Sequence, residues 1–266
     1  MATSQPARDQ QPTPTPAKPV IGVLLVHGLN GSQKDFAEME ALFLARGMVV
    51  VNMLLPGHGS KIKEMLNTGW SEWSQAVYDE LLALKQRCDV VFLVGHSLGG
   101  ALSLHVAAHE EVAGIVSICS PSHMHPGLKV AVSIARHITP LLPTLREDVR
   151  DRVGRQRYKR DGYRWTPMRP VESLLQFLPH LREELPNITT PALIMTSIHD
   201  HVVPARDGRD IYRRIGSREK HLVTLHRSYH VVMKDHDREE VFAKTLTFIQ
   251  RHAAKAQPHQ KSDQTA

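Results

Sequence analysis

The sequence predicts an α/β fold with a mostly parallel, doubly wound sheet of about six core strands. Short runs of β-prone apolar residues alternate along the chain with longer stretches of helical periodicity. Most of these runs are continuously apolar, which is typical of parallel strands that are buried on both faces. Repeated strand–helix units favour right-handed crossovers, with helices covering both faces of one sheet.

Six runs are predicted to be the core strands, and five stretches are predicted to be helices of the core. The strands are expected at Val20–Val26, Met48–Leu54, Val90–Val94, Val112–Ile118, Ala192–Ser197 and His221–Leu225. The helices are expected at Gln33–Arg46, Trp70–Arg87, Leu98–His109, Ala205–Ile215 and Asp237–Ala253.

One interval, 122–186, interrupts this alternation. It shows no strand pattern, only helical periodicity broken by prolines such as Pro170 and Pro179. A structureless loop of that length is improbable in a compact domain. A helical cap is therefore predicted at 122–186, inserted between two parts of the core at 20–121 and 187–253. The cap begins where strands end, which is where open α/β sheets bind ligands.

Composition fits one globular domain with unstructured ends. The chain has 266 residues, of which 41% are hydrophobic and 23% charged, enough for a large core. Residues 1–19 and 254–266 are predicted to be a disordered leader and tail. Cys88 and Cys119 form no C-x-x-C pair, which favours a reducing compartment. Because no signal peptide or membrane-length apolar run is found, a cytoplasmic location is expected.

The net charge of +6 gathers mainly between Arg146 and Arg169. Aromatic residues suited to base stacking are sparse in that stretch. Neither nucleic acid nor stable membrane association is therefore expected, and the oligomeric state stays open.

A nucleophile elbow is predicted at Gly95-His96-Ser97-Leu98-Gly99. G-x-S-x-G falls here at a sharp turn from strand to helix, which projects the Ser97 hydroxyl to where a base can deprotonate it. Gly95 and Gly99 keep the turn free of Cβ clashes. A phosphate-binding loop is disfavoured because G-x-G-x-x-G and G-K-[ST] are both missing. A plain tight connection is the other alternative.

The acid and the base are predicted at Asp200 and His230. Both follow strands, and the chain order serine, acid, histidine is the one expected with such an elbow. A helix-capping role is the alternative for Asp200, whereas Asp207 and Asp210 are expected to face away or to form surface pairs. His226 is the alternative base.

The other histidines near these loops are interpreted differently. His27, His58 and His96 are expected to be structural or to support the site. His199 and His201 flank Asp200 and suggest a metal site, but a solvated turn fits better because no third ligand cluster follows.

An oxyanion hole needs a second backbone amide beside that of Leu98. The loop His27-Gly28-Leu29-Asn30-Gly31 follows the first core strand, and its glycines allow close approach to a substrate. The amide of Leu29 is the predicted donor. The alternative is a simple Gly-Asn-Gly turn.

These motifs resemble those of α/β-hydrolases, specifically small bacterial carboxylesterases related to monoacylglycerol lipases. The resemblance runs from Ile21 to Arg251. It rests on the segments His27–Gly31, Pro56–Gly59, Gly95–Gly100, Thr166–Met168, His199–Val203 and Ser228–Val231. It implies a Ser97–His230–Asp200 triad with oxyanion amides at Leu29 and Leu98. Relatives often carry an aromatic residue at the position of Leu29.

A serine carboxylic-ester hydrolase is therefore expected, without a metal or organic cofactor. Its substrates would be small esters of short to medium acyl chains, or monoacylglycerols. The alternatives are a thioesterase or acyltransferase with the same triad, or a binding protein that keeps the fold. The cap holds more apolar residues than it can bury internally, so part of them should line an acyl groove. Gly28, Met124, Met168 and Phe177 are the predicted substrate-binding residues.

Overall fold

The computed structural model describes residues 19–59, 62–123, 127, 130, 132–134, 139–143, 148–157 and 165–256. Almost all of the predicted leader and most of the predicted tail lie outside these residues, and so does Met124. Among the described helices, none combines the length and the apolar character needed to cross a membrane.

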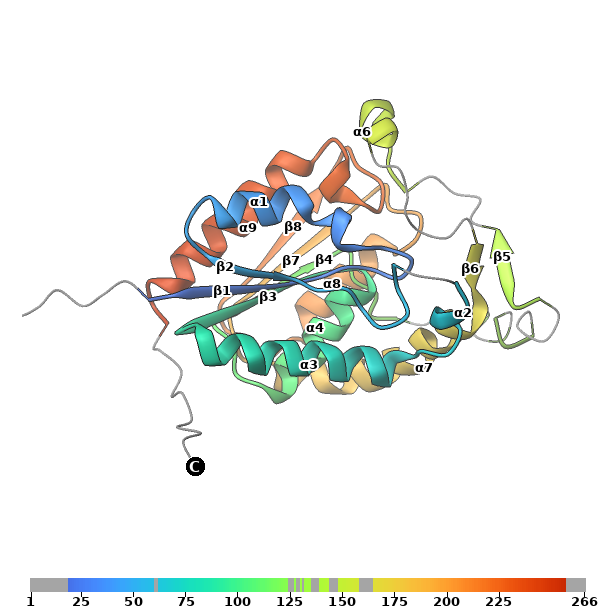
Figure 1. Ribbon diagram of the computed structural model, residues 1–266, viewed down its shortest axis with the longest axis horizontal. Coiled ribbons are helices and arrows are strands. Elements are labelled where there is room, and N and C mark those ends of the chain that lie inside the picture. Colours follow the sequence, from blue (N-terminus) through green and yellow to red (C-terminus); the bar gives the residue numbers. More distant parts are fainter. Residues whose placement is uncertain are drawn as a thin grey trace, which may run out of the picture.

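A six-stranded parallel sheet forms the centre of the molecule (Figure 1). Its strand order is β2-β1-β3-β4-β7-β8, and every neighbouring pair is parallel. The strands are β1 Ile21–Val26, β2 Val49–Asn52, β3 Val90–His96, β4 Gly114–Ile118, β7 Ala192–Ser197 and β8 Lys220–Leu225. The six predicted strands are thus confirmed, with ends shifted by at most two residues.

The strand order reverses between β1 and β3. From β1 the chain moves outward to the edge strand β2 and then returns to the other side of β1 as β3. Loops that leave the carboxyl ends of β1 and β3 therefore diverge, and the carboxyl ends of strands at such a reversal are the usual ligand position in open α/β sheets. The predicted oxyanion loop and the predicted elbow are these two loops.

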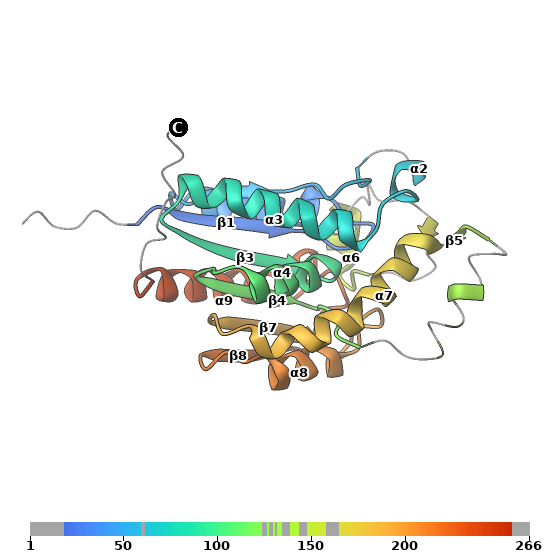
Figure 2. The same cartoon turned by 90° about the horizontal axis from the view of Figure 1, so that it is seen from below.

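Helices cover both faces of the sheet (Figures 1 and 2). The core helices are α1 Ala37–Leu44, α3 Trp70–Arg87, α4 Leu98–His109, α8 Ala205–Arg214 and α9 Arg238–Ala253. The single helix predicted over Gln33–Arg46 is divided into a 3₁₀ turn, Gln33–Asp35, and α1. Further short elements are α2 Ile62–Met65 and the 3₁₀ turns Leu185–Asn187 and Val232–Lys234.

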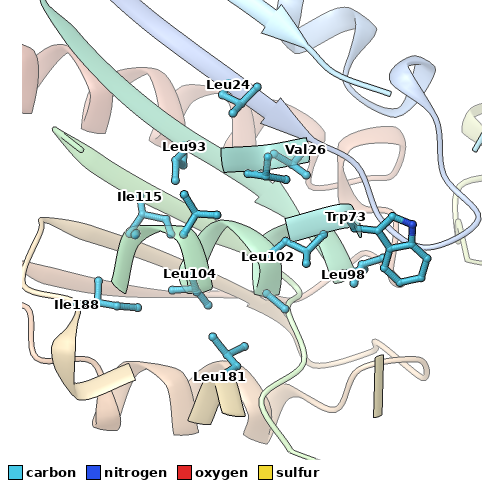
Figure 3. Close-up of a cluster of buried hydrophobic side chains, with 14 of the residues drawn as sticks. Leu24, Val26, Trp73, Leu93, Leu98, Leu102, Leu104, Ile115, Leu181 and Ile188 are labelled. Atoms are coloured by element: carbon cyan, nitrogen blue, oxygen red, sulfur yellow. The ribbon is translucent and has the colours of Figure 1, made fainter. Parts of the chain in front are cut away.

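The strands divide the core into two layers because alternate side chains point to opposite faces. Leu24 and Leu93 belong to the layer under α3 and α4, whereas Val23 and Phe92 belong to the layer under α1 and α9. Figure 3 shows the first layer, where Leu104 of α4 lies between the sheet and Leu181. Each fully buried aliphatic side chain of this kind contributes about 1.5–3 kcal/mol to folding.

The segment between β4 and β7 contains both strand and helix. The strands β5 Leu141–Pro143 and β6 Trp165–Pro167 pair antiparallel, so the prediction of an entirely helical cap is wrong. Each strand has only three residues, too few to produce an alternating pattern in the sequence. Met168 N donates to Pro140 O at 3.0 Å and so extends the pairing by one residue on each strand. A contact to another segment also holds the pair: Asn30 Nδ2 donates to Thr166 Oγ1 at 3.1 Å.

The rest of this segment contains α6 Arg152–Arg157 and the long helix α7 Met168–Glu184. Pro179 lies inside α7 without ending it, contrary to the predicted break. Proline in a helix interior removes one backbone hydrogen bond. Burial of Phe177, Leu178 and Leu181 against the core offsets that loss. In both views α7 runs from the β5–β6 pair back to the core.

Candidate active site

Ser97 stands at a strained turn between β3 and α4. Its backbone angles are φ 52° and ψ −121°, a conformation that costs a non-glycine residue about 1–3 kcal/mol. A Cβ atom at Gly95 would collide with the Gly99 carbonyl, and one at Gly99 with the Val26 carbonyl. Only glycine fits either position. The predicted strand–turn–helix geometry at G-x-S-x-G is confirmed.

Asp200 and His230 form a buried hydrogen-bonded pair. His230 Nδ1 donates to Asp200 Oδ2 at 2.7 Å, and Asp200 Oδ1 accepts from the amides of Val202 and Val203 at 2.8 and 2.9 Å. Burial raises the pKa of Asp200, but His230 and the two amides outweigh it and hold that pKa below its ordinary value. An ionised Asp200 fixes the Nδ1–H tautomer, which leaves the lone pair on His230 Nε2.

His96 joins the elbow to the His230 loop. Its Nε2 donates to the backbone oxygen of His230 at 3.0 Å, and the two rings lie 4.7 Å apart. Burial, with the neighbouring His230, lowers the pKa of His96 to about 3, so this ring stays neutral. The residue next to Ser97 in the chain therefore contacts the residue predicted to be its base.

Gly28 brings the predicted oxyanion loop against the elbow. A Cβ atom at Gly28 would lie 3.1 Å from Ser97 Cβ and 3.2 Å from His96 Nδ1. Leu98 is the first residue of α4, so its amide has no acceptor within the helix. Asn30, in a left-handed conformation with φ 59°, ties the loop to Thr166 on β6.

His27 and His58 hold the predicted oxyanion loop in place, as expected for structural histidines. His27 Nδ1 donates to Gly28 O at 2.9 Å, and its Nε2 accepts from Leu55 N at 3.1 Å, which defines a neutral tautomer. Burial lowers the pKa of His27 to about 3 and that of His58 to about 4. The His58 ring lies between those of His27 and Trp73, at 4.9 and 5.8 Å.

The predicted acyl-pocket residues occupy different environments. Met168 is buried at the start of α7, directly after Thr166 and Pro167 of β6. Phe177 is fully buried, stacked on Trp70 at 5.0 Å and edge-on to His105 at 5.4 Å. That position is one of core packing, because its neighbours are α3 and α4 rather than the elbow.

Asp235 anchors the His230 loop, a role that the sequence did not indicate. Its two buried oxygens accept from four backbone amides at 2.7–2.8 Å: those of Arg150, Asp151, Tyr229 and His236. Val231 N also donates to Asp148 O at 2.9 Å. Residues 148–151 are thus fastened to the loop that carries His230. The feature of the sequence that could have indicated this role is the position of Asp235, between the loop that carries His230 and helix α9.

The expectation that Asp207 faces away or pairs at the surface is wrong. Asp207 is buried, and its Oδ2 accepts from the amides of Ser122 and His123 at 3.1 and 3.2 Å. Asp210 does form charged pairs, with Arg182 at 3.1 Å and Arg214 at 2.9 Å. The helix period alone could not predict that the chain leaving β4 would cover the first turn of α8.

His199 and His201 do not form a metal site with Asp200 in the described ranges. His199 is exposed, and the His201 ring packs edge-on against Tyr229 at 4.9 Å. Neither histidine belongs to a group of three or more metal-ligating side chains within the described part of the chain.

Comparison with known proteins identifies relatives over nearly the whole chain. The family model for serine aminopeptidase, S33 (Hydrolase_4), matches residues 17–237. A thermostable monoacylglycerol lipase of Bacillus sp. (strain H-257) is 31% identical over 88% of this chain and 92% of its own length. A carboxylesterase of Bacillus subtilis (strain 168) is 25% identical over 86% of this chain and 92% of its own.

A solved structure gives the same result in three dimensions. It comes from work on the metagenome-derived lipolytic enzymes LipS and LipT and superposes with a TM-score of 0.82. Its sequence is 34% identical, covering 87% of this chain and 94% of the other. The chain therefore belongs to the serine aminopeptidase (S33) family of hydrolases, and its fold is the α/β-hydrolase fold.

Proposed function

We propose that the chain hydrolyses carboxylic esters through an acyl-enzyme formed on Ser97. The hydrogen-bonded pair His230–Asp200, held against the elbow through His96, is the observation that carries this proposal. A buried serine at a strained elbow beside such a pair is the arrangement used for nucleophilic catalysis.

Each residue has one task in the proposed reaction. His230 Nε2 removes the Ser97 proton as the hydroxyl attacks the ester carbonyl, and it then protonates the departing alcohol. The amides of Leu29 and Leu98 hold the oxyanion. Asp200 keeps the imidazole in its tautomer and stabilises the positive charge that forms on the ring. A water molecule, activated by the same histidine, then releases the acid.

The proposed substrates are esters of short to medium acyl chains, including monoacylglycerols. The similarity to a monoacylglycerol lipase and to a carboxylesterase supports this class. Part of the cap would line the acyl groove, with Met168 at the start of α7 as its wall and Gly28 beside the carbonyl. Each additional methylene bound in that groove contributes up to about 0.8 kcal/mol.

Two substitutions test the proposed triad. Ser97→Ala and His230→Ala should each abolish hydrolysis of a p-nitrophenyl ester, while circular dichroism and the unfolding temperature show a folded protein. His226→Ala is the matched control and should keep wild-type activity. Loss of activity in His226→Ala with retention in His230→Ala would reassign the base.

The same triad could serve acyl transfer or thioester hydrolysis. One relative supports the alternative of acyl transfer: a dihydrolipoyllysine-residue acetyltransferase component of Pseudomonas putida is 26% identical over 92% of this chain. Turnover of acyl-CoA beside p-nitrophenyl esters of equal acyl length separates these activities. Labelling of Ser97 by a fluorophosphonate distinguishes an enzyme from a binding protein.

A further inference from the structure

Three potential metal ligands meet outside the active site, where α4 packs against α7. His105 and His109 lie one turn apart on α4, and Glu184 is the last residue of α7. His105 Nδ1 donates to Glu184 Oε2 at 2.6 Å, and His109 Nε2 donates to Glu184 Oε1 at 3.1 Å. One ligand atom of each residue lies within 4.8 Å of the other two. No other group of three such residues occurs within the described ranges.

We propose that His105, His109 and Glu184 bind a divalent transition-metal ion, with Zn²⁺ as the preferred ion. Two imidazoles and one carboxylate form a donor set that suits zinc. Histidines spaced i and i+4 on one helix face can share one metal ion. This site is separate from the hydrolytic reaction, for which the sequence implies no metal.

The observed distances suit metal insertion with little rearrangement. Tetrahedral zinc with bonds of about 2.0–2.2 Å holds its ligand atoms about 3.3–3.5 Å apart. The two histidine–carboxylate contacts at 2.6 and 3.1 Å need to open by less than about 1 Å to admit the ion. Both imidazoles then use the nitrogen that now faces Glu184.

The surroundings hold the site in place and leave it accessible. The His105 ring packs edge-on against Trp70 at 5.9 Å and Phe177 at 5.4 Å, which fixes its orientation. The His109 side chain is 54% exposed, whereas those of His105 and Glu184 are 19% and 20% exposed. Solvent thus gives the ion a path of entry and supplies water for its remaining coordination position.

The position of the site implies a structural role for the ion. α4 begins directly after Ser97, so His105 and His109 lie about 12 and 18 Å further along the helix axis. α7 leads from Met168, directly after β6, to Glu184. Figure 3 shows the adjoining part of this interface, where Leu104, next to His105 in the chain, faces Leu181. A bound ion would therefore cross-link the returning arm of the cap to the helix that carries the elbow.

The test uses the full chain without a histidine tag, stripped with EDTA and then freed of chelator. Calorimetric titration with Zn²⁺ should show one site that weakens at least tenfold in His109→Gln and in Glu184→Gln. His226→Gln, which removes an exposed histidine outside the cluster, should bind like the wild type. Co²⁺ should give the wild type the visible spectrum of four-coordinate cobalt, and both ligand variants should lose it.

Thermal unfolding provides the second readout. Saturating Zn²⁺ should raise the unfolding temperature of the wild type and of His226→Gln, but not that of Glu184→Gln. Ester hydrolysis should be the same in the stripped and zinc-loaded protein, so this result does not depend on the proposed triad. Equal zinc affinity in wild type and His109→Gln would overturn the proposal and leave an ordinary interhelical ion pair.

Discussion

Gly28 brings the proposed oxyanion loop against Ser97, the proposed nucleophile. We expect Gly28→Ala to lower kcat about 10²–10³-fold, the usual effect of losing one oxyanion donor. The physical reason is that the new methyl group would lie 3.1 Å from Ser97 Cβ and push the loop outward. Steady-state kinetics on a p-nitrophenyl ester measures the change. Leu29→Ala keeps the backbone amide and should retain most of kcat; a Gly28→Ala enzyme with wild-type kcat would contradict the assigned hole.

Substitutions at Met168 and Phe177 distinguish a residue that lines the proposed acyl groove from one that packs in the core. Met168→Trp should shift the acyl-length optimum toward shorter chains in a C2 to C12 ester series, because the larger side chain shortens the proposed groove. Phe177→Trp should lower the unfolding temperature without moving that optimum, since Phe177 is fully buried between α3, α4 and α7. An unchanged optimum in Met168→Trp would show that the groove does not pass this residue.

At the scale of elements, the Asp235 carboxylate joins the His230 loop to residues 150 and 151. Asp235→Asn replaces an acceptor oxygen by a donor, so two of the four backbone amides lose their partner. An unsatisfied buried donor costs about 1–3 kcal/mol, and these part-buried amides should cost up to that amount each. Urea unfolding should report that loss, and kcat should fall because the loop no longer holds His230. Glu240→Gln on the exposed face of α9 is the control and should change the free energy of unfolding by less than about 0.5 kcal/mol.

Helices and strands whose residues follow a regular hydrophobic period could be predicted from the sequence. Elements that depend on contacts between residues far apart in the chain could not. Strand β3 and helix α4 follow from their own residues, because a run of β-prone apolar residues and a longer stretch rich in alanine and leucine have distinct patterns. Strands β5 and β6 depend on pairing with each other and on contacts to the oxyanion loop. Pro179 was predicted to break a helix that tertiary packing in fact maintains.

The same distinction applies to the site. Ser97, Asp200 and His230 each follow a strand, and this chain order is what selected them as the candidate triad. The structure brings Asp200 and His230 into hydrogen-bond contact. Asp235 and Asp207 act through burial and through amides more than 80 positions away in the chain. Spacing along the chain contains no information on such partners.

At the scale of the whole molecule, three buried neutral histidines make stability sensitive to acid. Burial lowers the pKa of His27 and His96 to about 3 and that of His58 to about 4. Below about pH 6.5 these three histidines take up protons in the unfolded chain but stay neutral in the folded protein. The free energy of unfolding therefore falls as the pH falls toward 4. With three protons involved, the slope approaches about 4 kcal/mol per pH unit.

Urea unfolding at pH 7, 6 and 5 measures this slope. His58→Gln should reduce it by about a third, because one of the three linked protons is removed. His226→Gln, an exposed control, should leave the slope unchanged. A free energy of unfolding that is constant from pH 7 to pH 5 would show that the three rings take up protons as readily in the folded protein as in the unfolded chain.

Helix α8 holds the segment between β4 and β7 at both of its ends. Asp207 and Asp210 bind Ser122 where that segment begins, and Asp210 also binds Arg182 near the end of α7. Since a single core helix fastens the departing and the returning chain, the length and sequence between them can change without displacing the sheet. The cap is in this sense a variable segment that is anchored at both ends to an unchanging core. We therefore expect changes within this segment to alter substrate choice while the sheet and the elbow beneath it stay in place.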